Sequence, residues 1–476
     1  MTKTYTAPAP GINLVTAAQQ PGRLTVQFEA APEKVSAGEP GMSTGDVLFL
    51  RNADGSSALT VSLGKREKIR AESFRQAGGA LAAWLIKHNV EQAQIDTAAL
   101  AAFGVGSAES ALLEGMLLGA FRFGRYKSGE ETPTIPTVSL SGGDGLEQTL
   151  DEARKLAAAV NLARDWGHEP ANVINPVTLA ERVTELASEY NLKVTIIDDN
   201  ALKEMGAGAI HAVGKGSKTP SRLILLEYPG ADGTGDPVVL VGKAITFDTG
   251  GYSLKDSSNI LGMKYDKCGA MATIGSVVAA ASLGLKTRVI GVVAAAENMV
   301  SGEAYRPDDI LTTLSGKTVE IISTDAEGRL VLADALTYAA RNLNPRAMVD
   351  FATLTGACVV ALGKVRAGLL STDDGLAEAL YQAGEATHER LWRLPLDEDY
   401  DQQIKGDDGD IKNSGGREAG AIIGGTFLKN FVVPAVPWAH IDIAGMASVA
   451  KDMPYCQKGA TGFGVRLAVA YLKGLE

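Results

Sequence analysis

Apolar and polar residues recur along this chain with two different periods. In the first 130 residues, short apolar runs at 24–28 and 47–50 predict strands. Apolar residues spaced three or four apart at 72–88 and 110–123 predict helices. Residues 127–136 then become polar and rich in proline, as is typical of a boundary. We therefore expect a smaller N-terminal α/β domain over residues 1–145.

The rest of the chain alternates helices and strands regularly. A helical pattern predicts a linker helix over 146–168, and the two prolines and two asparagines of 169–176 predict a loop. Further helices are expected at 178–190, 269–283, 328–341 and 461–475, and strands at 193–197, 222–227, 237–241, 288–294, 318–322, 347–352 and 438–443. This alternation predicts an α/β domain over 169–476, with a mixed, largely parallel sheet flanked by helices.

Three of the predicted strands end in polar, glycine-rich sequence. These segments are 242–251, 323–329 and 353–356. In open α/β sheets, ligands bind beyond the carboxyl ends of the strands. The three segments are therefore expected to form the functional site.

Composition and charge exclude several classes of protein. The 476 residues include 45 Lys and Arg against 56 Asp and Glu, and the net charge of −11 argues against nucleic acid as the main partner. The three cysteines are far apart, which argues against disulfides and cysteine zinc sites. Residues 1–8 show no targeting segment, and no run reaches the ~18 apolar residues of a membrane span. We expect a soluble cytoplasmic protein that does not bind membranes.

Acidic residues dominate the glycine-rich segments. Asp325 and Glu327 lie two apart after a strand, so an extended backbone would point both to one side. Asp248 precedes two glycines, and Asp266 precedes a helix. Four carboxylates gathered in one cleft would repel one another, and two divalent cations would relieve that repulsion. Oxygen ligands suit Mn²⁺, Mg²⁺ or Zn²⁺, whereas the chain has no HExxH zinc motif.

Each of these residues also has an ordinary structural role. Thr324 and Glu327 have the spacing of a capping box for the following helix. Asp248 fits a turn, and Asp266 fits the favourable dipole of a helix start. Taken singly, each residue favours its structural role. Only the joint position of the acids at strand ends favours a metal site.

Three motifs together resemble the leucyl aminopeptidase family, the M17 cytosol aminopeptidases. They are Val-Gly-Lys-Ala-Ile-Thr-Phe-Asp-Thr-Gly-Gly at 241–251, Met-Lys-Tyr-Asp at 263–266 and Ser-Thr-Asp-Ala-Glu-Gly-Arg-Leu at 323–330. The family usually has Asn, Gly and Ser where this chain has Ser323, Ala244 and Thr249. None of these departures removes a candidate ligand. The resemblance covers residues 165–476, while the N-terminal third matches weakly.

The resemblance implies a site with two metal ions, Mn²⁺ or Zn²⁺. Asp248 and Glu327 would bridge both ions, Asp325 would complete one site, and Lys243 with Asp266 would hold the second. Two divalent ions balance the four carboxylates, so Lys243 would bind as the neutral amine. The implied reaction is removal of the N-terminal residue of a peptide by a metal-bridging hydroxide.

The resemblance also implies catalytic and substrate-binding residues. Lys255 would stabilise the oxyanion, and Arg329 would hold a bicarbonate ion that carries the proton. Met263, Thr353 and Ala447 would wall the pocket for the first residue, and the backbone at Leu354 and Gly356 would align the peptide. Such an apolar pocket predicts a preference for Leu or other apolar residues.

Two other functions stay open, and the family implies an assembly. A dimetal phosphoesterase uses similar carboxylates but also needs basic side chains that bind the phosphate. Near these acids the sequence offers only Arg329 and Lys255 for that role. An additional DNA-binding role would use the basic and aromatic cluster at 122–127, which also fits a packed or solvated face. The family resemblance implies a homohexamer acting on peptides.

Overall fold

The computed structural model describes residues 11–20, 23–31, 42–51, 56–128, 134–233 and 235–476. Residues 1–8 and part of the polar stretch 127–136, discussed above, therefore lie outside the described residues. The described chain forms two compact units, and the division falls at Leu162, within helix α3 (Leu146–His168). Residues 449–459 belong with the N-terminal unit. Among the helices described, none is long and apolar enough to cross a membrane.

The N-terminal unit is a six-stranded sheet with two helices packed on each other. The sheet order is β1-β6-β5-β2-β4-β3, and only the pair of β3 and β4 is antiparallel. Glycine lets the helices approach, because a Cβ at Gly115 would lie 2.0 Å from the carbonyl oxygen of Arg75. The elements are β1 (Asn13–Thr16), β2 (Leu24–Ala31), β3 (Val47–Arg51), β4 (Ser57–Lys65), α1 (Ala71–Lys87), β5 (Gln92–Asp96), α2 (Ala108–Gly119) and β6 (Thr137–Ser141).

The larger unit is built on an eight-stranded mixed sheet, as the sequence predicts. Its order is β15-β14-β17-β13-β9-β10-β8-β7. The four central strands β17, β13, β9 and β10 are parallel, and antiparallel pairs flank them on both sides. The strands are β7 (Lys193–Asp198), β8 (Arg222–Tyr228), β9 (Val238–Asp248), β10 (Val289–Asn298), β13 (Ala347–Ala352), β14 (Ala367–Ser371), β15 (Leu391–Arg393) and β17 (Trp438–Asp442).

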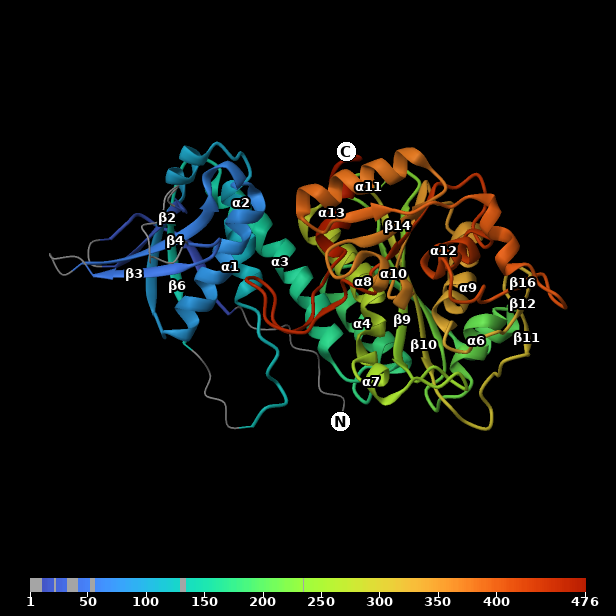
Figure 1. The fold of residues 1–476 in the computed structure, drawn as a ribbon. Coiled ribbons are helices and arrows are strands. Elements are labelled where there is room, and N and C mark those ends of the chain that lie inside the picture. The colour runs from blue at the N-terminus through green and yellow to red at the C-terminus, as the bar shows by residue number, and fades with distance from the viewer. Residues whose placement is uncertain (1–10, 21–22, 32–41, 52–55, 129–133, 234) are drawn as a thin grey trace. The chain divides into compact units, whose positions relative to one another are not determined.

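Helices cover both faces of this sheet (Figure 1). Along β9, Val239 and Val241 join the core cluster that includes α9. The alternate residue Gly242 faces α8, where a Cβ would lie 2.5 Å from Cα of Ala270. The helices are α4 (Pro176–Glu189), α5 (Asp199–Glu204), α6 (Gly208–Gly214), α7 (Ser257–Ile260), α8 (Cys268–Leu283), α9 (Glu327–Asn342), α10 (Gly356–Leu362), α11 (Asp374–Thr387), α12 (Gly420–Lys429) and α13 (Val465–Lys473).

The sheet differs from the sequence expectation in three ways, the first being that strands β14 and β15 are not predicted. Strands β9 and β10 continue to Asp248 and Asn298, several residues past their predicted ends, because their last polar side chains bond to each other. The strand expected at 318–322 is short and does not join the main sheet. It is β12 (Thr318–Glu320), between β11 (Ile310–Thr312) and β16 (Ile411–Lys412) in a three-stranded sheet. A short apolar run does not encode which sheet it joins, since pairing depends on distant segments.

Four parallel strands bring their carboxyl ends to one edge. Asp248, Asn298 and Asp442 end β9, β10 and β17, and Thr353 follows the end of β13. Two remaining short strands, β18 (Ser448–Val449) and β19 (Gly459–Ala460), form a separate pair. The edge that holds Asp248 and Thr353 is where the candidate site lies.

Candidate active site

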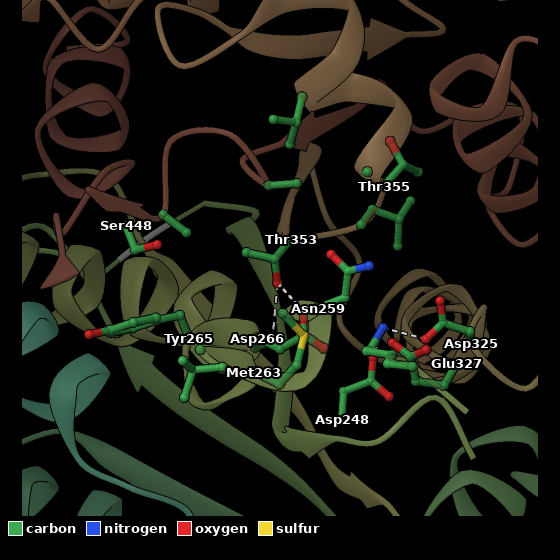
Figure 2. A pocket seen from close by; sticks show the side chains of 18 of the residues that line it. Asp248, Asn259, Met263, Tyr265, Asp266, Asp325, Glu327, Thr353, Thr355 and Ser448 are labelled. Carbon is green, nitrogen blue, oxygen red and sulfur yellow. Dashed lines mark hydrogen bonds and ion pairs between the residues drawn. The ribbon is translucent and has the colours of Figure 1, made fainter. Parts of the chain in front are cut away.

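Three carboxylates from two segments converge at this edge. Asp248 ends β9, Asp325 lies in the turn before α9, and Glu327 is the first residue of α9. One oxygen from each lies within 4.8 Å of the others, and Figure 2 shows Asp325 beside Glu327. Asp248 and Glu327 are buried, whereas the side chain of Asp325 is 40% exposed. The cluster is compact enough to share a cation, and one of its acids remains open to solvent.

The backbone around these acids is not extended, which corrects the sequence expectation. Residues 324–325 form a turn, and α9 then begins at Glu327. Thr324 does not cap the helix either, because its hydroxyl donates to the carbonyl of Gly250 at 2.6 Å and accepts from the amide of Ser253 at 2.8 Å. Thr324 therefore joins the two glycine-rich segments to each other. Gly250 has φ +85°, a conformation that L side chains rarely adopt.

Lys243 and Asp266 form the inner part of the site. Lys243 Nζ lies 2.9 Å from Asp266 and 2.9 Å from Glu327 Oε1, and it donates to the carbonyl of Thr353 at 2.8 Å. The Thr353 hydroxyl in turn donates to Asp266 Oδ1 at 2.6 Å. Glycine at position 328 makes room for Lys243, because a Cβ there would lie 2.6 Å from Nζ. Lys243 thus links Asp266 to the three clustered acids.

Lys255 lies on the other side of the cluster. Its Nζ is 2.8 Å from Oδ2 of Asp248, and it also contacts Asp325. The side chain is 15% exposed, compared with 3% for Lys243. Lys255 is therefore the more accessible of the two lysines in the site.

The electrostatics of this cluster leave a surplus of negative charge. Burial raises the pKa of Asp266 to about 8, although Lys243 opposes the rise. Burial, with help from Glu327, raises the pKa of Asp248 to about 6. For Lys243, burial lowers the pKa, but Asp266 and Glu327 outweigh it and raise the pKa overall. Four carboxylates face only two lysines, so a bound cation would be favoured.

An unsatisfied acceptor indicates the same need. Oε2 of Glu327 is buried and accepts no hydrogen bond from the residues that the structure describes. A buried carboxylate oxygen without a donor costs free energy unless a ligand or ion satisfies it. Oxygen donors with one amine suit a hard or borderline divalent cation. The residues present therefore fit a divalent metal.

A cavity of about 800 Å³ opens beside the cluster. Every site residue predicted from the sequence except Arg329 lines it: Lys243, Asp248, Lys255, Met263, Asp266, Asp325, Glu327, Thr353, Leu354, Gly356 and Ala447. Figure 2 shows Met263 and Thr353 near Asp266, with Tyr265 and Ser448 farther from the three clustered acids. The tertiary structure thus brings acids, lysines and apolar wall residues to one cavity.

Arg329 lies behind this cavity, not on its wall. It is buried on α9, and its Nη1 donates to the carbonyl of Asn413 at 2.8 Å. Its Nε is buried without a hydrogen-bond partner among the described residues. Burial lowers the pKa of this guanidinium to about 10, against the opposing charges of Glu327 and Asp442. This buried N–H could donate a hydrogen bond to a small anion.

Two residues that the sequence did not suggest also organise the site. Asn298 donates to Asp248 Oδ1 at 2.8 Å and to the carbonyl of Thr324 at 3.0 Å. Asp442 accepts from the amide of Leu354 at 3.1 Å and from the hydroxyl of Thr355 at 2.7 Å. Both residues end buried strands. A polar residue at the end of a strand next to those of Asp248 and Thr353 is the one feature that could have indicated a role in the site.

The basic cluster at 122–127 is partly used by the fold. Arg122 Nη1 donates to the carbonyls of Gly119 at 2.7 Å and Phe121 at 2.6 Å. The guanidinium of Arg125 lies 5.4 Å from the ring centroid of Phe123. Nothing in these contacts favours nucleic acid over a packed segment.

Comparison with known proteins identifies both units. The catalytic domain of the cytosol aminopeptidase family matches residues 161–469, and the N-terminal domain of that family matches residues 33–130. A "Probable cytosol aminopeptidase" of Syntrophotalea carbinolica is 43% identical over 441 residues, 90% of this chain and 88% of that protein. One from Geobacter sulfurreducens is 44% identical over 426 residues, 87% of this chain and 84% of that protein.

A solved structure resembles the whole chain. It is described as the "Bottromycin maturation enzyme BotP in complex with Mn". The TM-score is 0.88 at 34% sequence identity, and the match covers 95% of this chain and 99% of that one.

Proposed function

The chain belongs to the cytosol aminopeptidase family and is a metal-dependent aminopeptidase that acts on peptides, and we propose that it prefers N-terminal Leu or other apolar residues. The observation that carries the proposal is the cluster of Asp248, Asp325 and Glu327, with oxygens within 4.8 Å, on the wall of an 800 Å³ cavity. Because the cavity also holds apolar side chains, one site can bind the first residue and cleave the bond that follows it.

Two divalent cations, Mn²⁺ or Zn²⁺, complete this site. Five residues would hold these ions: Asp248 and Glu327 would be shared by both, Asp325 would serve the first, and Lys243 with Asp266 would serve the second. Bound cations would supply a water activated for attack on the peptide carbonyl and a Lewis acid that binds the lone pair of the uncharged α-amine. They would also take the place of the protons that the raised pKa values of Asp248 and Asp266, caused mainly by burial, favour in a site without metal. The metal cations would balance the charge of the carboxylates around Lys243. The carboxylates would then no longer raise the pKa of Lys243, which would bind as the neutral amine.

Lys255 orients and stabilises the carbonyl oxygen. Its Nζ already lies among Asp248 and Asp325, at the cavity wall. Burial lowers the pKa of Lys255, but the surrounding carboxylates outweigh it and raise the pKa overall. The side chain is therefore an ammonium that can donate to an oxyanion as charge develops.

Arg329 would hold a bicarbonate ion, which would supply oxygens able to take a proton from water and pass it to the leaving amine. The support is its buried Nε, which has no partner among the described residues, and the lack of a His on the described cavity wall. Arg329 is a positioning residue in this scheme, because its own guanidinium keeps its protons.

The first residue of the peptide lies against Met263, Thr353 and Ala447. All three line the cavity, and Figure 2 shows Met263 and Thr353 next to Asp266, on the side away from Asp325. An apolar wall distinguishes ligands by only ~1–3 kcal/mol per methylene, so cleavage of several apolar first residues follows. The carbonyl of Leu354 and the backbone of Gly356 align the chain beyond the scissile bond.

The proposal has two further parts. Assembly into a homohexamer rests on the family resemblance alone, and a cytoplasmic location rests on the family and on the sequence composition. Light scattering of the purified protein tests the first, and cell fractionation tests the second.

One assay separates this function from a dimetal phosphoesterase. The purified protein, loaded with Mn²⁺ or Zn²⁺, is given Leu-p-nitroanilide, Asp-p-nitroanilide and p-nitrophenyl phosphate. We expect hydrolysis of the Leu compound well above that of the Asp compound and none of the phosphate ester. Faster hydrolysis of the phosphate ester, or equal rates on Leu and Asp, would overturn the proposal.

A further inference from the structure

The outer part of the cavity exposes large apolar side chains. Leu254 and Leu261 follow β9, and Val360 lies on α10; their exposed fractions are 64%, 86% and 89%. All three line the same cavity as the acids. We call them the apolar rim. Apolar groups clustered at the mouth of a polar site favour a ligand with apolar groups of its own.

One cation of this cavity lacks an anionic partner. Lys243 and Lys255 are paired with the clustered acids, whereas Lys364 makes no ion pair or hydrogen bond with any residue that the structure describes. Asp256 also lines the cavity, but its carboxylate caps α7, where it accepts hydrogen bonds from the amides of Ser258 and Asn259. An unpaired ammonium beside an apolar rim suits an anionic group on an otherwise apolar ligand.

The turn that carries Lys364 is held against the cavity wall. Gly363 ends α10 with φ +65° and donates to the carbonyl of Val359 at 2.9 Å. A Cβ at Gly445 would lie 2.3 Å from the carbonyl oxygen of Gly363, so the turn packs directly on the segment that holds Ala444 and Ala447. The backbone of Lys364 is therefore fixed, while its side chain extends into solvent at the cavity mouth.

Helix α10 separates Lys364 from the Thr353 segment that contacts Lys243. Lys243 bonds to the carbonyl of Thr353, and α10 leads from Gly356 outward to the turn at Lys364. At ~1.5 Å per residue, the helix from Gly356 to Leu362 spans about 9 Å, and the turn adds the last two steps to Lys364. An extended peptide covers ~3.3–3.6 Å per residue, so three or four residues bridge this length.

We propose that Lys364 binds the free C-terminal carboxylate of short peptide substrates, while the apolar rim contacts the side chains after the scissile bond. The preferred substrates are then tripeptides and tetrapeptides with apolar residues behind the first. This inference rests on the proposed function, because the α-amine must be anchored at the acids. Lys364 is a specificity-determining residue that acts on binding.

A matched series of peptides tests the carboxylate contact. Leu-Ala, Leu-Ala-Ala, Leu-Ala-Ala-Ala and a six-residue homologue are compared as free acids and as C-terminal amides. For the wild-type enzyme we expect the acid-to-amide ratio of kcat/KM to be greatest, about two- to fivefold, at three or four residues, as for an exposed ion pair. The difference should lie in KM and shrink as salt is added.

Substitutions at Lys364 assign the effect. In Lys364→Met the acid-to-amide ratio should fall to that of the six-residue peptide, and in Lys364→Glu it should drop below it. The exposed Lys203 on α5 provides the control, and Lys203→Met should keep the wild-type ratio. Because each ratio is taken on one preparation, differences in folding or metal content cancel.

Two results would overturn the inference. One is a wild-type ratio that does not depend on peptide length, and the other is an unchanged ratio in Lys364→Met. Failure of the proposed function would look different, because the wild-type enzyme would then cleave neither the acids nor the amides.

The apolar rim is tested separately. Val360→Ser should reduce the preference for Leu-Phe-Ala over Leu-Ser-Ala, with the change in KM. An unchanged preference would remove the rim from the proposal.

Discussion

The side-chain amide of Asn298 donates to Oδ1 of Asp248 at 2.8 Å, across the paired ends of strands β10 and β9. The amide of Gly250 donates to the same oxygen at 2.8 Å. These two bonds hold the carboxylate so that Oδ2 lies 2.8 Å from Lys255 Nζ. Asn298 therefore sets the orientation of Asp248, the acid that is proposed to be shared by both metal ions.

Asn298→Ala should weaken metal binding. Partners that orient a metal ligand contribute about 10- to 100-fold in affinity, so we expect a loss in that range for Mn²⁺. Calorimetric titration of the metal-free enzyme measures it. Asn342→Ala, at the exposed end of α9, is the control and should bind Mn²⁺ normally. Unchanged affinity in Asn298→Ala would make the asparagine a purely structural residue.

Gly328→Ala should displace Lys243 while leaving α9 helical. The added Cβ would lie 2.5 Å from Cε and 2.6 Å from Nζ of Lys243. Alanine otherwise favours a helix over glycine by ~0.5–1 kcal/mol, so lost helix propensity would not explain a defect. We expect one of the two metal ions to bind more weakly, as measured by elemental analysis after dialysis. Full metal content with normal turnover would argue against Lys243 as a ligand.

Lys255→Ala should lower turnover without removing metal. A well-placed oxyanion donor is worth about 100- to 1000-fold in kcat. We expect kcat for Leu-p-nitroanilide to fall by that factor at unchanged metal content. A variant that instead loses metal would place Lys255 among the residues that hold the ions.

Metal removal should lower both activity and stability. Without cations, Asp248, Asp266, Asp325 and Glu327 face only two lysines at one buried site. Binding at a free concentration of about 100 times Kd stabilises a fold by ~2.7 kcal/mol. Thermal denaturation should therefore show a lower Tm after chelation, restored by added Mn²⁺. Equal Tm and activity before and after chelation would contradict a resident metal.

The buried pair of His440 and Asp350 predicts a pH dependence of stability. His440 Nδ1 lies 2.6 Å from Asp350, and neither side chain is exposed. Burial lowers the pKa of His440, but Asp350, with Asp442, outweighs burial and raises it above its ordinary value, whereas Arg329 opposes the rise. A group of this sign stabilises the fold fully below the unfolded pKa of about 6.5 and loses that contribution as pH rises through the folded pKa.

Asp350→Asn should abolish this dependence. The difference in unfolding free energy between wild type and variant should shrink as pH rises from about 6 to about 9. Denaturant titration at several pH values measures it. A constant difference across that range would mean that His440 stays neutral in the folded protein.

Much of the architecture follows from residue order. The pattern of apolar positions predicts helix α9 to within one residue at each end, and the mixed sheet that it predicts, with parallel strands at its centre, is confirmed. It underestimates β9 and β10, because the polar residues Thr246, Asp248 and Asn298 resemble loop sequence until their partners are known. It also misplaces β12, whose partners β11 and β16 lie elsewhere in the chain.

The candidate site divides in the same manner. Sequence motifs identify the acids, Lys243 and Lys255, because the spacing of charged residues and glycines is local information. The contacts of Thr324 with Gly250, of Asn298 with Asp248, and of Lys364 with the cavity appear only after the chain has folded. Periodicity reports how each segment divides its own residues between core and solvent, which is a local property. Which strand ends become neighbours depends on packing among segments far apart in the chain, and that packing alone brings these partners together.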